Sequence, residues 1–193
     1  RVSASASAVC QGEILQTQRQ FDLNLTHNEY FRIIEMKTGS LFATATELGA
    51  RLAGADQQTQ ENLRDFGMKV GIAYQIYDDC LDLVGNEELA GKTLRTDLAK
   101  GKLTLPVLNL IASSTQSQRE KLNKYLLLKE PIDVDTLAGI ADYDGSIDKA
   151  TATGKEILAE ATQHLACLPE TPYCSGLMQV TGYLDSLLDT CLS

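Results

Sequence analysis

The chain has 193 residues, of which 44% are hydrophobic and 22% charged, a composition typical of a globular protein and too apolar for a disordered one. Acidic residues outnumber basic ones by 26 to 17, giving a formal net charge of −9. This balance argues against nucleic acid as a partner, because nucleic-acid-binding proteins present a basic surface. No apolar run approaches the length of a membrane span, so we expect no transmembrane segment.

The five cysteines do not form a CxxC pair, which indicates reduced thiols, favours a cytoplasmic location and argues against a zinc site. The first eight residues, RVSASASA, have neither a Met nor an apolar stretch and do not resemble a signal peptide. The missing initiator Met suggests that the natural chain begins further upstream. The length predicts a single domain over residues 1–193.

Helical periodicity runs through almost the whole chain, and strand-like alternation is scarce. A capping box at Thr26 and Glu29 and an N-cap at Asp56 mark two helix starts, segment 86–97 reads as a polar loop, and Pro106 is expected to kink or restart a helix. We predict helices over residues 13–21, 30–53, 57–84, 98–112, 116–128, 133–140, 144–168 and 173–192. The predicted architecture is an all-α bundle around one core.

The third predicted helix carries an acidic stripe. On a helical wheel an arc of about 100° holds its polar side chains Gln75, Asp78, Asp79 and Asp82. The rest of this part of the helix is apolar nearly all round, so three carboxylates would repel one another and lose solvation unless a cation lay against them. Oxygen ligands at positions i, i+1 and i+4 suit Mg²⁺.

Two other readings of the stripe stay open: a solvated acidic face and an internal salt-bridge network. A calcium EF-hand is a poor fit, because Leu83 occupies the position where that loop requires Gly.

Lysines flank the stripe in the sequence. Lys37 lies in the otherwise apolar second helix, whereas Lys92 and Lys102 lie downstream of the stripe. Acids together with separated lysines suggest a polyanion bridged between a metal ion and ammonium groups, which describes a diphosphate. The alternatives are that Lys37 is an ordinary surface lysine and that the other two lysines only keep a loop soluble. No Walker-type glycine pattern is present, so P-loop chemistry is not supported.

Three segments resemble those of the trans-type polyprenyl diphosphate synthases: KTGSLFATATELGARLAG, YQIYDDCLDLVG and GKTLRTDLAKGKLTLP. The resemblance extends over about residues 12–110, and the middle segment is similar to the second aspartate-rich region of that family. A lone DDxxD also occurs in terpene cyclases, but the ordered set of motifs favours chain-elongating synthases. The resemblance implies a helical bundle of the isoprenoid synthase type that lacks its N-terminal helices.

The same resemblance implies a homodimeric prenyltransferase that condenses isopentenyl diphosphate with an allylic diphosphate and uses Mg²⁺. By analogy, Lys37, Thr38, Gln75 and Lys92 would be catalytic, the first and last of them binding diphosphate oxygens together with Lys102. The oxygens of Thr38 and Gln75 would face the allylic cation. The metal would be held by Asp78, Asp79 and Asp82, and through water by Asp97.

The chain also departs from the family pattern. It has one DDxxD where the family has two, it lacks the upstream GK motif and arginine pair, and Arg95 stands where Gly is common. Either the chain is the C-terminal part of a synthase, or it is a non-catalytic partner or regulatory subunit of a heteromeric synthase; a terpene cyclase ranks third. With half of the constellation missing, we expect this chain alone to be inactive.

Overall fold

The computed structural model describes residues 1–85, 87–91, 93–127 and 134–192. Every secondary-structure element in these ranges is helical, so the predicted all-α class is confirmed. The elements are α1 Val2–Gln18, α2 His27–Ile34, η1 Glu35–Gly39, α3 Ser40–Leu52, α4 Gln57–Val84, α5 Glu87–Ala90, α6 Thr96–Ala99, α7 Leu105–Ser113, α8 Gln116–Leu126, α9 Val134–Ile140, α10 Tyr143–Gln163, η2 His164–Cys167 and α11 Pro172–Asp189.

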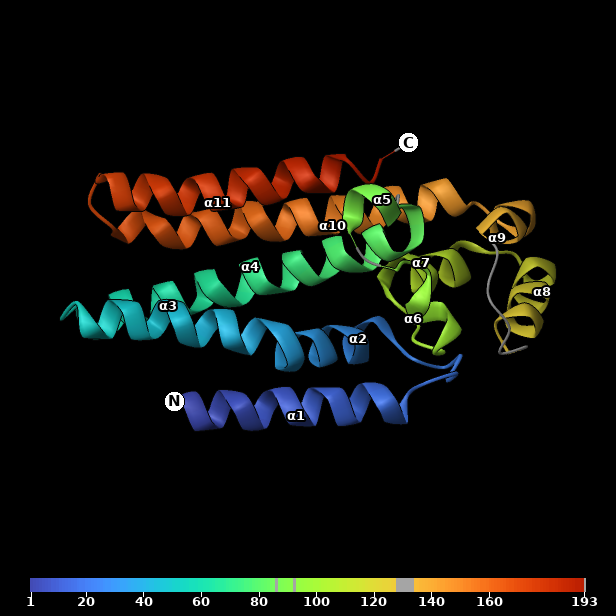
Figure 1. Cartoon of the computed structure of the whole chain (residues 1–193), viewed down its shortest axis with the longest axis horizontal. Helices are drawn as coiled ribbons and strands as arrows, with labels where there is room; N and C mark the ends of the chain where they lie inside the picture. The colour runs from blue at the N-terminus through green and yellow to red at the C-terminus, as the bar shows by residue number, and fades with distance from the viewer. Residues whose placement is uncertain (86, 92, 128–133, 193) are drawn as a thin grey trace.

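The long helices lie side by side along the longest axis of the molecule (Figure 1). Helix α4 packs between α3 and α10, α1 covers α2, η1 and α3, and α11 covers α10. The short helices α6 and α7 pack against α4 near its C-terminal end, and α8 and α9 lie beyond them. None of the helices in the described ranges combines the length and the apolar character needed to cross a membrane.

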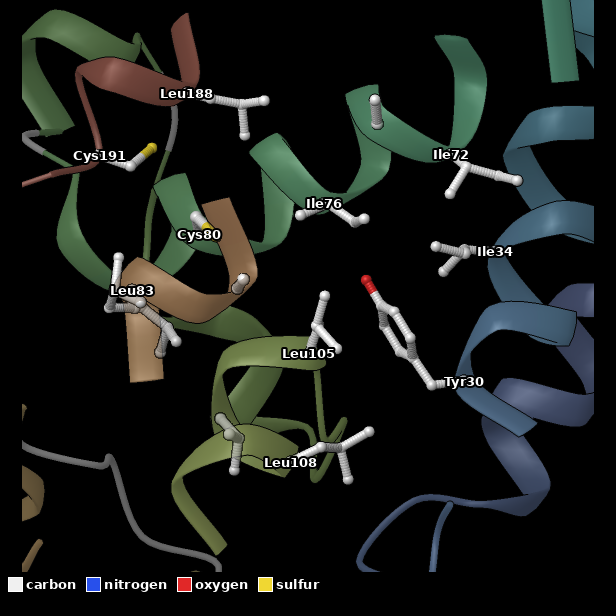
Figure 2. Packing of buried hydrophobic residues seen from close by; sticks show 14 of the residues in the cluster. Tyr30, Ile34, Ile72, Ile76, Cys80, Leu83, Leu105, Leu108, Leu188 and Cys191 are labelled. Carbon is white, nitrogen blue, oxygen red and sulfur yellow. The ribbon is translucent and has the colours of Figure 1, made fainter. Parts of the chain in front are cut away.

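A cluster of buried apolar side chains joins these helices. Figure 2 shows its centre, where Ile76 of α4 and Ile34 of α2, both fully buried, lie near Leu105 of α7. Leu188 of α11 extends the same cluster toward the C-terminus. Burial of each such side chain stabilises the folded state by roughly 1.5–3 kcal/mol. The cluster therefore fixes the position of the acidic part of α4.

Two predicted helix starts are confirmed. The hydroxyl of Thr26 accepts a hydrogen bond from the backbone N–H of Glu29 at 3.2 Å, and the Glu29 carboxylate accepts one from the Thr26 N–H at 3.0 Å. The carboxylate of Asp56 accepts the N–H of Thr59 at 2.8 Å at the start of α4. Both side chains satisfy backbone donors that the first turn leaves free.

The predicted helix over residues 30–53 is confirmed as one continuous helical run, but its middle is not regular α-helix. Residues Glu35–Gly39 form a π-helical turn, η1, between α2 and α3. Such a turn inserts one residue into the helix, and π turns are frequent at functional sites. It contains Lys37 and Thr38, so these two side chains project at angles that a regular helical wheel does not give.

Three other boundaries also differ from the prediction. Residues 13–21 were the readable part of the first helix, which extends back to Val2 and ends at Gln18. Its Ser- and Ala-rich start carries almost no apolar periodicity, so the sequence did not indicate that start. The segment expected to be a loop contains α5 and the start of α6, and the helix expected over 98–112 is divided between the end of α6 and α7, which begins at Leu105. Gly101, at φ +73°, breaks the chain direction there, and Pro106 lies in the first turn of α7.

Candidate active site

Helix α4 and the π turn approach each other backbone to backbone. A Cβ atom on Gly71 of α4 would lie 2.8 Å from the Cα of Gly39, which no real Cβ tolerates. The absence of side chains at both positions brings Thr38 against α4, where its hydroxyl donates a hydrogen bond of 2.7 Å to the side-chain oxygen of Gln75. The sequence predicted both polar residues for the site, and the structure joins them directly.

Asp79 is the most deeply buried carboxylate of the stripe. Its side chain accepts hydrogen bonds from the Tyr30 hydroxyl at 2.6 Å and from the Gln75 amide at 2.8 Å. Burial raises the pKa of Asp79 to about 7, although the Tyr30 hydrogen bond, the charge of Lys37 and the Gln75 hydrogen bond all act to lower it. Burial also raises the pKa of Tyr30 well above its usual value, so the phenol keeps the proton that it donates.

Asp82 binds the loop that follows α4 and holds it against the end of that helix. Its carboxylate accepts the backbone N–H groups of Thr96 at 3.3 Å and Asp97 at 3.2 Å, at the start of α6. The Asp82 carbonyl accepts the N–H of Arg95 at 2.8 Å. These contacts bring Asp97, predicted as a metal ligand, to the end of the stripe.

The described lysines of the predicted site lie around the same region. Lys102 forms a 3.0 Å ion pair with Asp97; burial lowers the pKa of this lysine, but its hydrogen bond to Asp97 and the nearby carboxylate charges raise it overall. The ammonium group of Lys37 donates to the side-chain oxygen of Gln16 at 3.2 Å. Lys92, predicted as the third diphosphate ligand, lies outside the described residues.

The predicted metal ligands therefore have three different surroundings. Asp79 is held by Tyr30 and Gln75, Asp82 is held by α6, and Asp78 is half-buried. In the described part of the chain, no three or more His, Cys, Asp and Glu side chains are arranged so that they could hold a metal ion. The metal assignment of these aspartates stays a prediction.

An exposed aromatic group flanks the stripe. Tyr74 lies one helical turn before Asp78 and so on the same face of α4, and 43% of its surface is exposed. Its ring lies 5.9 Å from that of Phe42 on α3 and 6.5 Å from that of Tyr77. An apolar surface therefore begins where the acidic stripe ends.

The sequence-based prediction assigned no site role to the aromatic group, nor to two hydrogen-bonding residues, Tyr30 and Gln16. Tyr30 lies on the apolar face of α2 beside Ile33 and Ile34, and a tyrosine on a buried face requires a partner for its hydroxyl. That signal was available in the sequence. Gln16 has no comparable signal, because its helix lacks a distinct apolar face.

The geometry unites a lysine–threonine turn, a glutamine and an aspartate stripe, in the order of the motifs quoted above. The sequence profile of the polyprenyl synthetase family matches residues 2–143. The chain belongs to the polyprenyl synthetase family. The predicted family and the predicted isoprenoid synthase type of bundle are thereby confirmed.

Curated polyprenyl synthetases from distant organisms are similar along nearly the whole chain. A short chain isoprenyl diphosphate synthase of Methanothermobacter thermautotrophicus is 31% identical over 186 residues, which cover 93% of this chain and 55% of that protein. Component 2 of the heptaprenyl diphosphate synthase of Bacillus subtilis is 33% identical over 95% of this chain and 52% of that protein. The chain thus spans about half the length of the curated relatives it matches.

Solved polyprenyl synthetase structures superpose closely on the fold. A polyprenyl synthase of Caulobacter crescentus, crystallised with calcium and isoprenyl diphosphate, gives a TM-score of 0.87 at 32% identity over 96% of this chain and 57% of that one. The heptaprenyl diphosphate synthase of Staphylococcus aureus gives 0.84 at 30% identity over 96% of this chain and 58% of that one.

Proposed function

We propose that the protein is a prenyltransferase that condenses isopentenyl diphosphate with an allylic diphosphate to a polyprenyl diphosphate, and that this chain is its C-terminal part. One observation carries the proposal: the stripe and lysines, suited to a diphosphate, adjoin the aromatic group of Phe42, Tyr74 and Tyr77, in which the rings of Phe42 and Tyr74 are exposed. A prenyl diphosphate has a charged head and an apolar tail, and this surface offers a region for each.

The residues fit Mg²⁺ by their chemistry. The candidate ligands offer only carboxylate oxygens, the hard donors that Mg²⁺ prefers, and a cation would favour the charged form of Asp79, whose pKa burial has raised. We propose that Asp78, Asp79 and Asp82 hold Mg²⁺ and that Asp97 supports it through water. When bound, Mg²⁺ would supply positive charge against the departing diphosphate.

Side chains of the chain itself would bind the diphosphate and stabilise the allylic cation. Lys37, Lys92 and Lys102 would bind diphosphate oxygens and stabilise the charge that develops as the bond to the prenyl group breaks. The Gln75 oxygen, which accepts the Thr38 hydroxyl, keeps a second lone pair. It can therefore stabilise an allylic cation by its dipole without forming a bond to it. The isopentenyl double bond would then attack the cation, and a proton would leave.

We further propose that the protein acts as a cytoplasmic homodimer and that residues 1–193 form one domain. The buried apolar cluster supports the single domain, since it extends from Leu25 to Cys191. The five cysteines are free, which is consistent with a reducing compartment. Sedimentation equilibrium would test the dimer.

A titration with two ligands tests the proposed site. Mg²⁺ together with inorganic diphosphate should raise the melting temperature of the chain by more than the sum of the two separate shifts, because each ligand supplies the charge that the other site lacks. Asp78→Asn should remove this coupling. Asp148→Asn, which neutralises an exposed aspartate on α10, should leave it intact. Additive shifts in the unmodified chain would refute a shared site.

The substrate class is tested by comparing two anions. In the presence of Mg²⁺, geranyl diphosphate should bind more tightly than inorganic diphosphate, because its tail can lie on the exposed rings of Phe42 and Tyr74. Tyr74→Ser should reduce that difference and leave the affinity for inorganic diphosphate unchanged. Equal affinities for the two anions in the unmodified chain would contradict a prenyl substrate.

A further inference from the structure

Tyr30 and Asp79 are joined by a buried hydrogen bond between two helices. The two residues are 49 positions apart in the sequence, only 2% and 3% of their surfaces are exposed, and the hydroxyl lies 2.6 Å from the carboxylate. Figure 2 shows the Tyr30 oxygen directed from α2 toward α4. The distance is typical of an O–H···O⁻ hydrogen bond to a carboxylate, which is shorter and stronger than a neutral one.

This hydrogen bond belongs to a chain of three. Thr38 donates to Gln75, Gln75 donates to one oxygen of Asp79, and Tyr30 donates to the other. Asp79 and Gln75 are one turn apart on α4, so the two contacts made by the segment of Tyr30 and Thr38 lie on adjacent turns of the same helix face.

The π turn begins after the first of these contacts and contains the second, that of Thr38. A π turn is an uncommon backbone state that persists where surrounding contacts specify it. Tyr30 fixes the segment before the turn and Thr38 fixes its end, so that Lys37, inside the turn, is held at a defined place beside the stripe.

We propose that Tyr30 is a positioning residue of the proposed diphosphate site, acting through Asp79. Its hydroxyl orients the Asp79 carboxylate and fixes the π turn that carries Lys37 against the aspartate stripe. This inference rests on the proposed function, because it concerns how the same site is held together.

The test is a double-mutant cycle on the affinity for inorganic diphosphate, measured by calorimetry with and without saturating Mg²⁺. Tyr30→Phe removes only the hydroxyl and should reduce the Mg²⁺-dependent gain in affinity about tenfold, as for other residues that orient metal ligands. In the Asp79→Asn background the same substitution should have no further effect, because the two residues act as a unit. Circular dichroism checks that each variant is folded.

Tyr143→Phe is the matched control. The Tyr143 hydroxyl is also buried, but it has no hydrogen-bond partner among the described residues, so its removal should leave the Mg²⁺-dependent gain unchanged. Should Tyr30→Phe not fold, 3-fluorotyrosine at position 30 preserves the packing, and its ¹⁹F resonance has to move when Mg²⁺ and diphosphate are added together.

Three results would overturn the proposal. A Tyr30→Phe chain whose gain stays within twofold of the unmodified chain excludes the positioning role. So does a Tyr30→Phe effect that persists in full in the Asp79→Asn background, because Tyr30 would then act through packing. If the unmodified chain shows no Mg²⁺-dependent diphosphate binding, the proposed function fails first, and the role of Tyr30 fails with it.

Discussion

Gly39 and Gly71 meet at the point where the π turn crosses α4, with a Cβ on Gly71 predicted to fall 2.8 Å from the Gly39 Cα. The contact is backbone against backbone, so no side-chain rotation can relieve it. Because Thr38 precedes Gly39, the same close approach determines the 2.7 Å hydrogen bond to Gln75.

Gly71→Ala should therefore lower the free energy of unfolding, by about 1–3 kcal/mol for overpacking at a site that cannot yield. Urea denaturation measures the change. Gly49→Ala is the matched control, since Gly49 lies within α3 and a Cβ there meets nothing within 4 Å. It should raise the free energy of unfolding by roughly 0.5–1 kcal/mol, because Ala is the better helix former. Equal effects of the two substitutions would contradict the close approach.

Local signals in the sequence predicted much of this frame. The capping residues Thr26, Glu29 and Asp56 could be predicted because each forms its capping hydrogen bond with a residue three positions away in the sequence. The stripe on α4 was readable because its side chains recur on one helical face. The π turn was not, because the apolar residues over 30–53 also recur at ordinary helical spacing in the sequence, whereas the inserted residue shifts which positions of α3 are buried.

The separate surroundings of the three aspartates could not be predicted, because they depend on distant residues. Asp79 finds its partner in Tyr30, and Asp82 finds its partners in Thr96 and Asp97 beyond a turn of the loop. On a helical wheel the three carboxylates are equivalent. Their different tertiary partners imply different effects of mutation.

Asp82 and Asp78 should behave differently in the metal-free chain. Asp82→Ala should lower the free energy of unfolding by about 1–2 kcal/mol, because it removes the carboxylate that accepts two N–H groups at the start of α6. Asp78→Ala should lower it less than Asp82→Ala does, since it also relieves repulsion from the neighbouring acids. Melting curves in a chelator compare the two. A larger loss for Asp78→Ala would favour a structural salt bridge at that position.

The metal-free chain should lose stability as the pH rises from about 4 to about 7. Burial raises the pKa of Asp79 to about 7, well above the usual value for an aspartate, so in this window the folded state binds more protons than the unfolded state. The free energy of unfolding then falls with rising pH, by an amount on the order of a few kcal/mol. Asp79→Asn should remove most of this dependence, whereas Asp148→Asn should keep it.

Urea titrations at pH 4.5 and 7.5 in a chelator measure how the free energy of unfolding changes with pH in the unmodified chain and in the Asp79→Asn chain. Because other groups titrate in both variants alike, the decisive quantity is the difference between the Asp79→Asn chain and the unmodified chain. An unchanged slope in Asp79→Asn would show that this carboxylate is already ionised throughout the window.

Arg95 adopts a backbone conformation that suits glycine. Its φ and ψ of 60° and 22° lie in the left-handed region, which costs a residue with a side chain about 1–2 kcal/mol. The N–H of Arg95 is bound to the Asp82 carbonyl at 2.8 Å, so the loop cannot easily leave this conformation. A glycine at this position would adopt it without strain.

Arg95→Gly should therefore raise the free energy of unfolding by roughly 0.5 kcal/mol or slightly more, because relief of the strain exceeds the greater entropy that Gly adds to the unfolded chain. Arg95→Ala is the control: it removes the same guanidinium but keeps a Cβ, so the strain remains and the stability should stay near that of the unmodified chain. Urea denaturation of the three proteins separates the causes. If Ala and Gly stabilise equally, the charge of Arg95 and not its backbone is the source of the strain.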